Sequence, residues 1–434
     1  MKGKGPRVGR PKAAGAPRRR RDDDRSARPD TAVEPPKPVA PYRLAERKRR
    51  ESGAVPAGRR QVEGDQVLGK RLAEALTFRG ETGRATHGFH AYPARLHPDT
   101  ARAVLDILPA TRVADPFCGG GTVLVEALLH GAEAVGGDLS AIALMVARAR
   151  TTVLEEEGAE KLREAATGVV QGAMARLREG PAPWIAPAVL RLRRWYQDDP
   201  LHELAALQNL IEKAPAGQRK ALTAVFSSLC IKFSLRASET SNRVVEVHRP
   251  RGAVLQAFVD KVEHYAIMQA DFRALLPTPR PSVSLAQIDA RNANFQPVDL
   301  VLTSPPYPGT YDYLLLQQLR SAWLGLDTAA RADDELGSRR KFRLRGALAY
   351  RQWLADTRQW MHTVGQRITP AGRMAVVVGE GIAAGRHYAV AEPTKEAAEA
   401  AGLRFVCGAA VERIDPALKR RKQEHILLFE RPEK

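Results

Sequence analysis

The order of apolar and polar positions predicts an α/β domain interrupted by helices. Short apolar runs predict buried strands at 112–115, 134–137, 282–288, 298–302, 374–378, 404–411 and 426–429. Residues 122–130 and a second stretch ending at Arg150 have apolar residues at helical spacing. Strands that alternate with helices in this way form βαβ units, so we expect a mostly parallel sheet with helices on its faces.

A largely helical stretch separates the first two strands from the others. Residues 155–177, 201–213 and 219–233 have helical periodicity, whereas 238–243 is expected to be a polar loop. We therefore expect four parts, namely a basic arm at 1–60, the first part of the α/β domain at 61–150, a helical insertion at 151–281 and the second part of the domain at 282–434.

Positive charge is concentrated at the N-terminus. The formal net charge is +19, and residues 1–60 hold 19 Lys or Arg against 7 Asp or Glu. Sparse, aperiodic apolar residues among abundant Pro, Gly and Arg predict disorder here. Such an arm is either a solvated tail or an electrostatic arm for a polyanion, and residues 9–12 (Gly-Arg-Pro-Lys) are a candidate minor-groove contact. Charge alone does not separate DNA from RNA or from an anionic membrane.

The cysteines and the hydropathy pattern restrict the setting of the protein. Cys118, Cys230 and Cys407 are odd in number and lack metal-ligand spacing, so we expect neither a disulfide framework nor a metal site. The basic N-terminus has no apolar core behind it, and no apolar run approaches the ~20 residues that span a bilayer. We therefore expect a reduced, cytoplasmic protein.

A glycine-rich loop lies between the strand at 112–115 and the helix that follows. The loop reads Asp115-Pro116-Phe117-Cys118-Gly119-Gly120-Gly121-Thr122. Its glycines allow close backbone approach to a ligand, and the helix N-terminus favours a carboxylate or phosphate. A dinucleotide fingerprint would need glycine where Leu124 stands, and a P-loop would need a lysine that is missing. The loop instead resembles the cofactor loop of Rossmann-like methyltransferases, which wraps the methionine end of S-adenosylmethionine.

Two further acids end predicted strands near this loop. Asp138 closes the strand at 134–137, where a carboxylate can accept hydrogen bonds from both hydroxyls of a ribose. It also precedes a helix, so a helix N-cap is the alternative interpretation. Asp289 follows the strand at 282–288 and is placed to hold an adenine amino group, although a turn residue would look the same.

The stretch Ser304-Pro305-Pro306-Tyr307 directly follows the apolar strand at 298–302. In an open α/β sheet, ligands bind outside the carboxyl ends of the strands. An exocyclic base amine is a poor nucleophile, and acceptors on its N–H groups expose its lone pair. The Ser304 hydroxyl and the Pro305 carbonyl can supply two such acceptors, which the prolines preorganise. Tyr307 can stack on a base that has left its helix. A proline-rich turn without function is the alternative interpretation.

Together these segments resemble the amino-methyltransferases of DNA, and most closely the cytosine-N4-specific ones, which carry Ser-Pro-Pro-Tyr at this site. Residues 86–98 also resemble a segment that precedes the cofactor loop in that family. The resemblance implies a Rossmann-like methyltransferase domain that uses S-adenosyl-L-methionine. It implies catalytic residues Ser304, Pro305, Pro306 and Tyr307. It also implies cofactor contacts by Tyr92, Asp115, Phe117, Cys118, Gly119, Gly121, Thr122, Asp138, Leu139 and Asp289.

The expected partner is a nucleic acid, DNA rather than RNA, with a cognate restriction enzyme as a candidate second partner. The helical insertion lies where some family members carry target-recognition elements, and its arginines, above all Arg236 and Arg243, are candidate nucleic-acid contacts. A solvated helical face would also account for them. An RNA base amino-methyltransferase, a DNA adenine-N6 methyltransferase and a non-catalytic nucleic-acid-binding protein remain as alternatives.

Overall fold

The structure is a computed structural model, and it describes residues 60–77, 83–93, 95–179, 185, 187–239, 241–327, 331, 333–414 and 421–433. All of them fall in one compact unit. The basic arm expected at 1–60 lies outside the described residues, apart from Arg60. None of the helices in the described ranges is long and apolar enough to cross a lipid bilayer.

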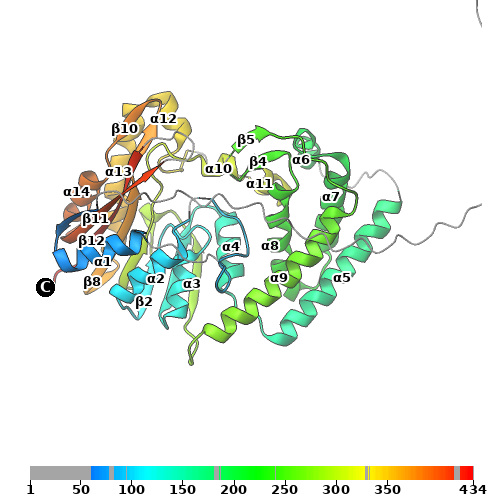
Figure 1. The fold of residues 1–434 in the computed structure, drawn as a ribbon, viewed down its shortest axis with the longest axis horizontal. Coiled ribbons are helices and arrows are strands. Elements are labelled where there is room, and N and C mark those ends of the chain that lie inside the picture. The colour runs from blue at the N-terminus through cyan, green and yellow to red at the C-terminus, as the bar shows by residue number, and fades with distance from the viewer. Residues whose placement is uncertain are drawn as a thin grey trace, which may run out of the picture. The chain divides into compact units, whose positions relative to one another are not determined.

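An eight-stranded sheet organises the α/β part of the molecule (Figure 1). Its order is β1-β11-β12-β8-β7-β2-β3-β6. The strands are β1 (Gln61–Gly64), β2 (Arg112–Asp115), β3 (Glu133–Asp138), β6 (Val283–Gln287), β7 (Val298–Thr303), β8 (Ile368–Gly379), β11 (Arg404–Ile414) and β12 (Arg421–Glu430). The run from β6 to β8 is parallel throughout, and the remaining pairs are antiparallel. The prediction of a mostly parallel sheet is confirmed.

Alternate residues of the central strands enter two different hydrophobic cores. Leu300 and Leu302 of β7 pack into the core that holds α1 (Gln66–Thr77), α2 (Pro98–Ile107) and α3 (Thr122–Leu129). Val301 packs into the opposite core, with α13 (Ala347–Gly365) and α14 (Ala391–Ala400). A parallel strand buried on both faces has this near-continuous apolar sequence.

The helical insertion has a hydrophobic core of its own, which adjoins α4 (Ala141–Thr151). Its helices are α5 (Glu156–Arg178), α6 (Pro187–Leu190), α7 (Asp198–Glu212), α8 (Ala216–Lys232) and α9 (Ala253–Leu275), with a 3₁₀ turn η1 (Arg193–Trp195). Trp323 of α11 (Gln318–Trp323) is fully buried in this core, where its indole N–H donates to the Tyr196 hydroxyl (2.9 Å). A segment that follows the Ser-Pro-Pro-Tyr stretch therefore packs on the insertion.

The polar stretch at 238–243 was expected to be a loop, and this prediction is wrong. β4 (Arg236–Ser238) pairs with β5 (Ser241–Val244) in an antiparallel hairpin. The pairing continues one residue beyond the two strands, away from the turn, since the Val245 N–H donates to the Leu235 carbonyl (2.8 Å). Strand formation depends on pairing context more than on the polarity of single residues, so the composition was misleading.

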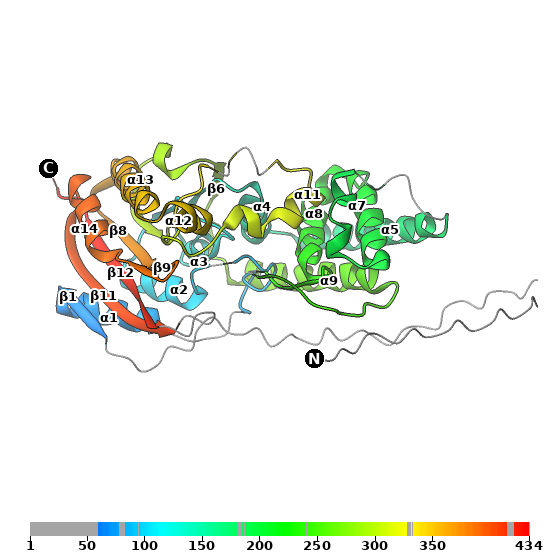
Figure 2. The ribbon, with the colours of Figure 1, turned by 90° about the horizontal axis from the view of Figure 1, so that it is seen from above.

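The remaining short elements follow β6, β7 and β8. They are η2 (Ala290–Asn292), α10 (Tyr313–Leu316), α12 (Arg339–Arg345), β9 (Gly381–Ala383) and β10 (Arg386–Tyr388). Seen from above, α12 and α13 lie in front of the sheet (Figure 2). These elements extend the edge at which the parallel strands end.

Candidate active site

The strand order reverses between β2 and β7. From β2 the chain continues outward to β3 and β6, and it then crosses back to add β7 and β8 on the other side. Such a switch point leaves a crevice at the carboxyl ends of the strands, where ligands of α/β proteins bind. The glycine loop follows β2, and the Ser-Pro-Pro-Tyr stretch follows β7. The fold thus brings both motifs to one crevice.

The glycine loop has a backbone that only glycine adopts without strain. Gly119 and Gly121 have φ of +49° and +78°. A Cβ on Gly121 would lie 3.0 Å from the Ala147 backbone, so α3 packs close to α4 there. α3 has no side-chain cap at its N-terminus. The hydroxyl of Thr122, at the start of α3, is buried and has no hydrogen-bond partner among the described residues. This backbone cradle fits an anionic or polar ligand group.

Asp138 shapes the loop as well as ending β3. Its carboxylate accepts from the backbone N–H of Gly119 (2.9 Å) and of Ser140 (2.8 Å). The helix N-cap is Ser140, which accepts from the Ala143 N–H, so the alternative N-cap interpretation of Asp138 does not apply. Burial raises the pKa of Asp138 to about 6, although both backbone hydrogen bonds oppose the shift.

The other residues expected at the cofactor surround this loop. Tyr92 lies over it, and a Cβ on Gly119 would be 3.3 Å from the Tyr92 ring. Phe117 makes an edge-to-face contact with Trp360 of α13, with ring centroids 5.3 Å apart. Cys118 is buried, and burial raises the pKa of its thiol well above the ordinary range. A thiol held protonated in this way is no nucleophile.

Asp289 lies at a more open place than the loop. It accepts from the Arg291 backbone N–H (2.9 Å) and caps η2, and it also pairs with the Arg291 guanidinium. With Leu139 it lines an open depression of ≈ 690 Å³ beyond β3 and β6. The carboxylate is therefore both a turn residue and a wall of a ligand-sized space. Its arginine partner was not expected from the sequence.

A buried hydrogen bond joins the ends of β2 and β7. The Thr303 hydroxyl donates to the Asp115 carboxylate (2.6 Å), which also accepts from the Phe117 N–H (3.1 Å). Burial raises the pKa of Asp115 to about 7, and the two hydrogen bonds oppose that shift. Asp115 thus positions Ser304 beside the glycine loop in this structure.

Tyr307 is held by residues from distant strands. Its hydroxyl donates to Glu424 of β12 (3.2 Å) and lies 3.4 Å from the Ser304 hydroxyl. Its ring packs on Gly379 at the end of β8, where a Cβ would lie 2.5 Å from the ring. Glu424 also pairs with Arg413 of β11. Glu424 and Arg413 were not predicted from the sequence, because they lie more than 100 residues after the motif.

The two prolines differ in how their carbonyls are used. The Pro306 carbonyl accepts from the indole N–H of Trp353 of α13 (3.1 Å). Among the described residues, no hydrogen-bond donor reaches the Pro305 carbonyl. The Pro305 carbonyl, which the sequence analysis predicted as an acceptor, is thus available to a ligand, while the Pro306 carbonyl is held by Trp353.

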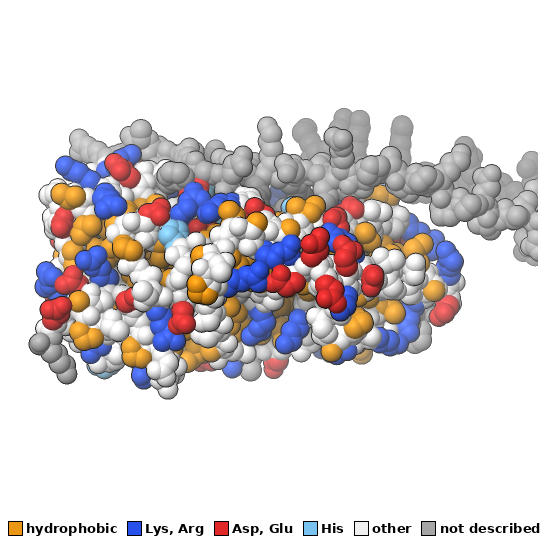
Figure 3. Space-filling view, turned by 90° about the horizontal axis from the view of Figure 1, so that it is seen from below, with side chains coloured by type: hydrophobic (Ala, Val, Ile, Leu, Met, Phe, Trp, Pro, Cys, Tyr) orange, Lys and Arg blue, Asp and Glu red, His pale blue; other side chains and the backbone are white. Residues whose placement is uncertain are grey.

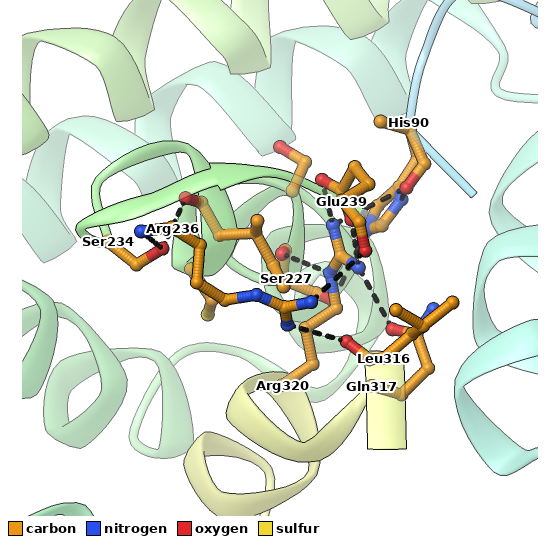
Figure 4. A network of polar contacts seen from close by, with 12 residues as sticks. His90, Ser227, Ser234, Arg236, Glu239, Leu316, Gln317 and Arg320 are labelled. Carbon is orange, nitrogen blue, oxygen red and sulfur yellow. Dashed lines mark hydrogen bonds and ion pairs between the residues drawn. The ribbon is translucent and has the colours of Figure 1, made fainter. Parts of the chain in front are cut away.

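Buried arginines tie this crevice to the helical insertion, and Figure 4 shows two of them, Arg236 and Arg320, with their partners. Arg150 donates to the carbonyls of Gly120 (2.7 Å) and His90 (2.6 Å). Arg320 of α11 donates to the Ser227 carbonyl of α8 (3.0 Å) and pairs with Glu239 after β4 (2.7 Å). Neither Arg150 nor Arg320 was expected, since an arginine at a helical position usually signals a solvated face.

Arg236 belongs to this network. It is 2% exposed, and its guanidinium donates to the carbonyls of Leu316 (2.9 Å) and Glu239 (3.3 Å). In this position it holds the hairpin against α10 and does not present its charge to a nucleic acid, contrary to our expectation. Arg243 of β5 is exposed. Within the described ranges, no group of His, Cys, Asp or Glu is arranged to hold a metal ion.

Comparisons with known proteins agree with this geometry. Residues 89–174 match a family model described as an RMKL-like methyltransferase domain. The chain is also similar to the Type II methyltransferase M.MvaI of Kocuria varians, with 24% identity over 296 residues, which cover 62% of this chain and 64% of the relative. The chain therefore spans less than two thirds of the length of this curated relative.

Solved structures give only weak similarity. TrmN of Thermus thermophilus has a TM-score of 0.30 at 14% identity, over 77% of this chain and 49% of that one. The rRNA methyltransferase aviRa of Streptomyces viridochromogenes has a TM-score of 0.32 at 12% identity, over 82% and 94%. Scores this low support no argument about function.

The strand order is that of a Rossmann-like fold, and the part of it that holds the glycine loop and Asp138 matches a methyltransferase domain. The cofactor of such a domain is S-adenosylmethionine, as the sequence predicted.

Proposed function

We propose that this protein transfers a methyl group from S-adenosylmethionine to an exocyclic amino group of a DNA base, and that the acceptor is N4 of cytosine. The main support is the placement of Ser304 beside the glycine loop, through the buried bond from Thr303 to Asp115. A site with a methyl donor on one side and hydrogen-bond acceptors on the other suits direct transfer to nitrogen.

In this proposal the glycine loop, Asp138 and Asp289 hold the cofactor, which supplies an electrophilic methyl group. Gly119 and Gly121 would hold its methionine end, and Asp138 would accept hydrogen bonds from its ribose hydroxyls. Asp289 and Leu139 line the space for the adenine. Because Arg291 already occupies the Asp289 carboxylate, one oxygen must serve both partners or the arginine must move.

The chain's own residues would prepare the amine. The Ser304 hydroxyl and the Pro305 carbonyl accept its two N–H hydrogens, which pulls the nitrogen toward tetrahedral geometry and frees its lone pair. Trp353 fixes the adjacent Pro306 carbonyl, and this would help to orient the Pro305 carbonyl before the base arrives. Tyr307, fixed by Gly379 and Glu424, offers its ring to the extruded base.

Serine at the first position of the motif favours cytosine over adenine, and the similarity to a Type II methyltransferase favours DNA over RNA. The test supplies the full chain with S-adenosylmethionine labelled in its methyl group and offers unmodified DNA or RNA of the same sequence. After digestion, label in deoxycytidine is the expected result. Label found only in RNA, or only in adenine, would refute the proposal in its specific form.

A further inference from the structure

The short helix α12 carries an unusual charge for its length. It has the sequence Arg-Arg-Lys-Phe-Arg-Leu-Arg and no acidic residue. Cations in the first turn oppose the helix dipole, and Arg339 and Arg343 repel each other four residues apart. Arg343 and Arg345 lie in the last turn, where cations suit the dipole, so the unfavourable charge is that of the first turn. An anionic partner would offset the cost.

The outer side of α12 is a leucine between two arginines. Phe342 is buried against Tyr388, with ring centroids 4.8 Å apart. At 100° per residue, Leu344 therefore lies on the opposite side of the helix, flanked by Arg343 and Arg345. Leu344 is 77% exposed, and both arginines are exposed.

These arginines are not neutralised by the fold. Among the described residues, neither Arg343 nor Arg345 has an acidic partner within 4.0 Å. Arg386 of the β9–β10 hairpin is also exposed, and its guanidinium lies 4.0 Å from the Cβ position at Gly346. By contrast, the face seen from below in Figure 3 shows basic side chains intermingled with acidic ones. We call Arg343, Leu344, Arg345 and Arg386 the α12 surface.

The helix α12, which carries this surface, is attached directly to the segment that follows Ser-Pro-Pro-Tyr. The Arg339 N–H donates to the Tyr311 carbonyl (3.0 Å), and the Arg339 side chain donates to the Thr310 carbonyl. A Cβ on Gly309 would lie 3.2 Å from the Phe342 ring. Gly309 is two residues after Tyr307, so the inner side of α12 packs on the segment that leads out of the base site, and the α12 surface faces outward from there.

We propose that the α12 surface binds the DNA backbone beside the base that is methylated, with Arg343, Arg345 and Arg386 on phosphates and Leu344 against the sugar edges. The inference rests on the proposed function. It goes further by assigning the DNA contact to an element outside the helical insertion. Phosphates and sugars together offer the anionic and apolar surfaces that this ridge matches. An interfacial membrane helix fits less well, because seven residues span only about 10 Å.

The experiment measures binding of a fluorescein-labelled DNA duplex to the full chain across a series of salt concentrations. The Arg343→Gln/Arg345→Gln double variant should bind roughly tenfold or more weakly, and the slope of log K against log salt should fall by about 2. Leu344→Ala should weaken binding and leave the slope unchanged. All of these proteins contain residues 1–60, so the charge of that segment does not contribute to the difference between parent and variant.

The matched control is Lys70→Gln/Arg71→Gln, which removes the same charge from exposed positions of α1. It should bind as the parent does. An unchanged slope in the α12 variant, or an equal loss in the control, would overturn the inference. So would α12 substitutions that abolish binding to phosphatidylserine vesicles but spare DNA. A parent protein that binds DNA yet methylates no base refutes the proposed function. The comparison of salt slopes still tests whether the α12 surface binds DNA.

Discussion

The two halves of the crevice are built in different ways. The cofactor half uses backbone conformation and contacts close in sequence, such as Gly119 to Asp138, 19 residues apart. The target half is the part around Ser304 and Tyr307. There, Tyr307 is held in place by Glu424, 117 residues away, and by packing on Gly379. A half built locally is recognisable from a motif, whereas a half built from distant strands exists only once the sheet has formed. The two should therefore fail separately when single residues are changed.

Ser304→Ala should produce the largest effect. It removes one preorganised acceptor whose interaction strengthens as charge develops on nitrogen, so turnover should fall roughly 10²–10³-fold. Cofactor affinity should stay near the parent value, because Ser304 belongs to the target half. Single-turnover kinetics at saturating cofactor, with calorimetry for cofactor binding, make the comparison. The exposed Ser284→Ala of β6 is the control. A defect confined to cofactor binding would contradict the assignment of Ser304 to the target half of the crevice.

Gly119→Ala should produce the converse defect. Alanine at φ +49° is strained by about 1–2 kcal/mol, and its Cβ would press on Tyr92 at 3.3 Å. Cofactor affinity should fall about 5- to 30-fold. Gly252→Ala is the matched control, since its φ is +86° with nothing within 4 Å of the new Cβ. Calorimetry should show loss only at Gly119, and equal losses in both would mean that general destabilisation is the cause.

Cofactor binding should also depend on pH through Asp138. Burial raises its pKa to about 6, and only the carboxylate can accept from two ribose hydroxyls. As pH falls through 6 the group protonates, so affinity at pH 5 should be about tenfold below that at pH 7. Asp138→Asn should bind weakly at both pH values. The profile of Ser304→Ala should follow the parent. If the cofactor affinity of the parent protein does not change between pH 5 and pH 7, Asp138 does not contact the cofactor.

Trp353→Phe should have the smallest effect of the four. It removes the indole N–H that fixes the Pro306 carbonyl, a neutral hydrogen bond of ~0.5–1.5 kcal/mol, so turnover should fall roughly 2- to 10-fold. Trp323→Phe is the control, because it also removes a buried indole N–H hydrogen bond, the one to Tyr196 in the core of the helical insertion (2.9 Å). Rates should fall only in the first variant once both are shown to be folded, and equal rates would exclude a positioning role for Trp353.

The difference between the halves explains how far the sequence could be interpreted. Every strand predicted from apolar periodicity is present, and the glycine loop and Asp138 meet as expected, because strand ends and turns are local properties. Glu424, Trp353 and Arg320 carried no local signal, since their roles depend on which strands and helices become neighbours. Arg236 was misinterpreted for a related reason. Its charge suggested a solvent-exposed surface, whereas the Leu316 and Glu239 carbonyls satisfy it inside the protein.

The α12 surface extends the same comparison. Its residues are adjacent in sequence, yet no periodicity marks a seven-residue helix as a site. What distinguishes it is the attachment of Arg339 to the segment after Tyr307 and the exposure of Leu344. Both properties require the folded chain.

The atom that receives the methyl group distinguishes direct transfer to the base amine from transfer to a ring carbon. Duplex DNA is incubated with the full chain and a cofactor carrying a deuterated methyl group, and the nucleosides are separated and fragmented in a mass spectrometer. We expect N4-methylcytosine, formed by direct transfer to the amine that Ser304 and Pro305 orient. A methyl group on ring carbon 5 would contradict it. That chemistry needs a cysteine nucleophile at the base, and Cys118 is buried in the cofactor loop with its thiol protonated.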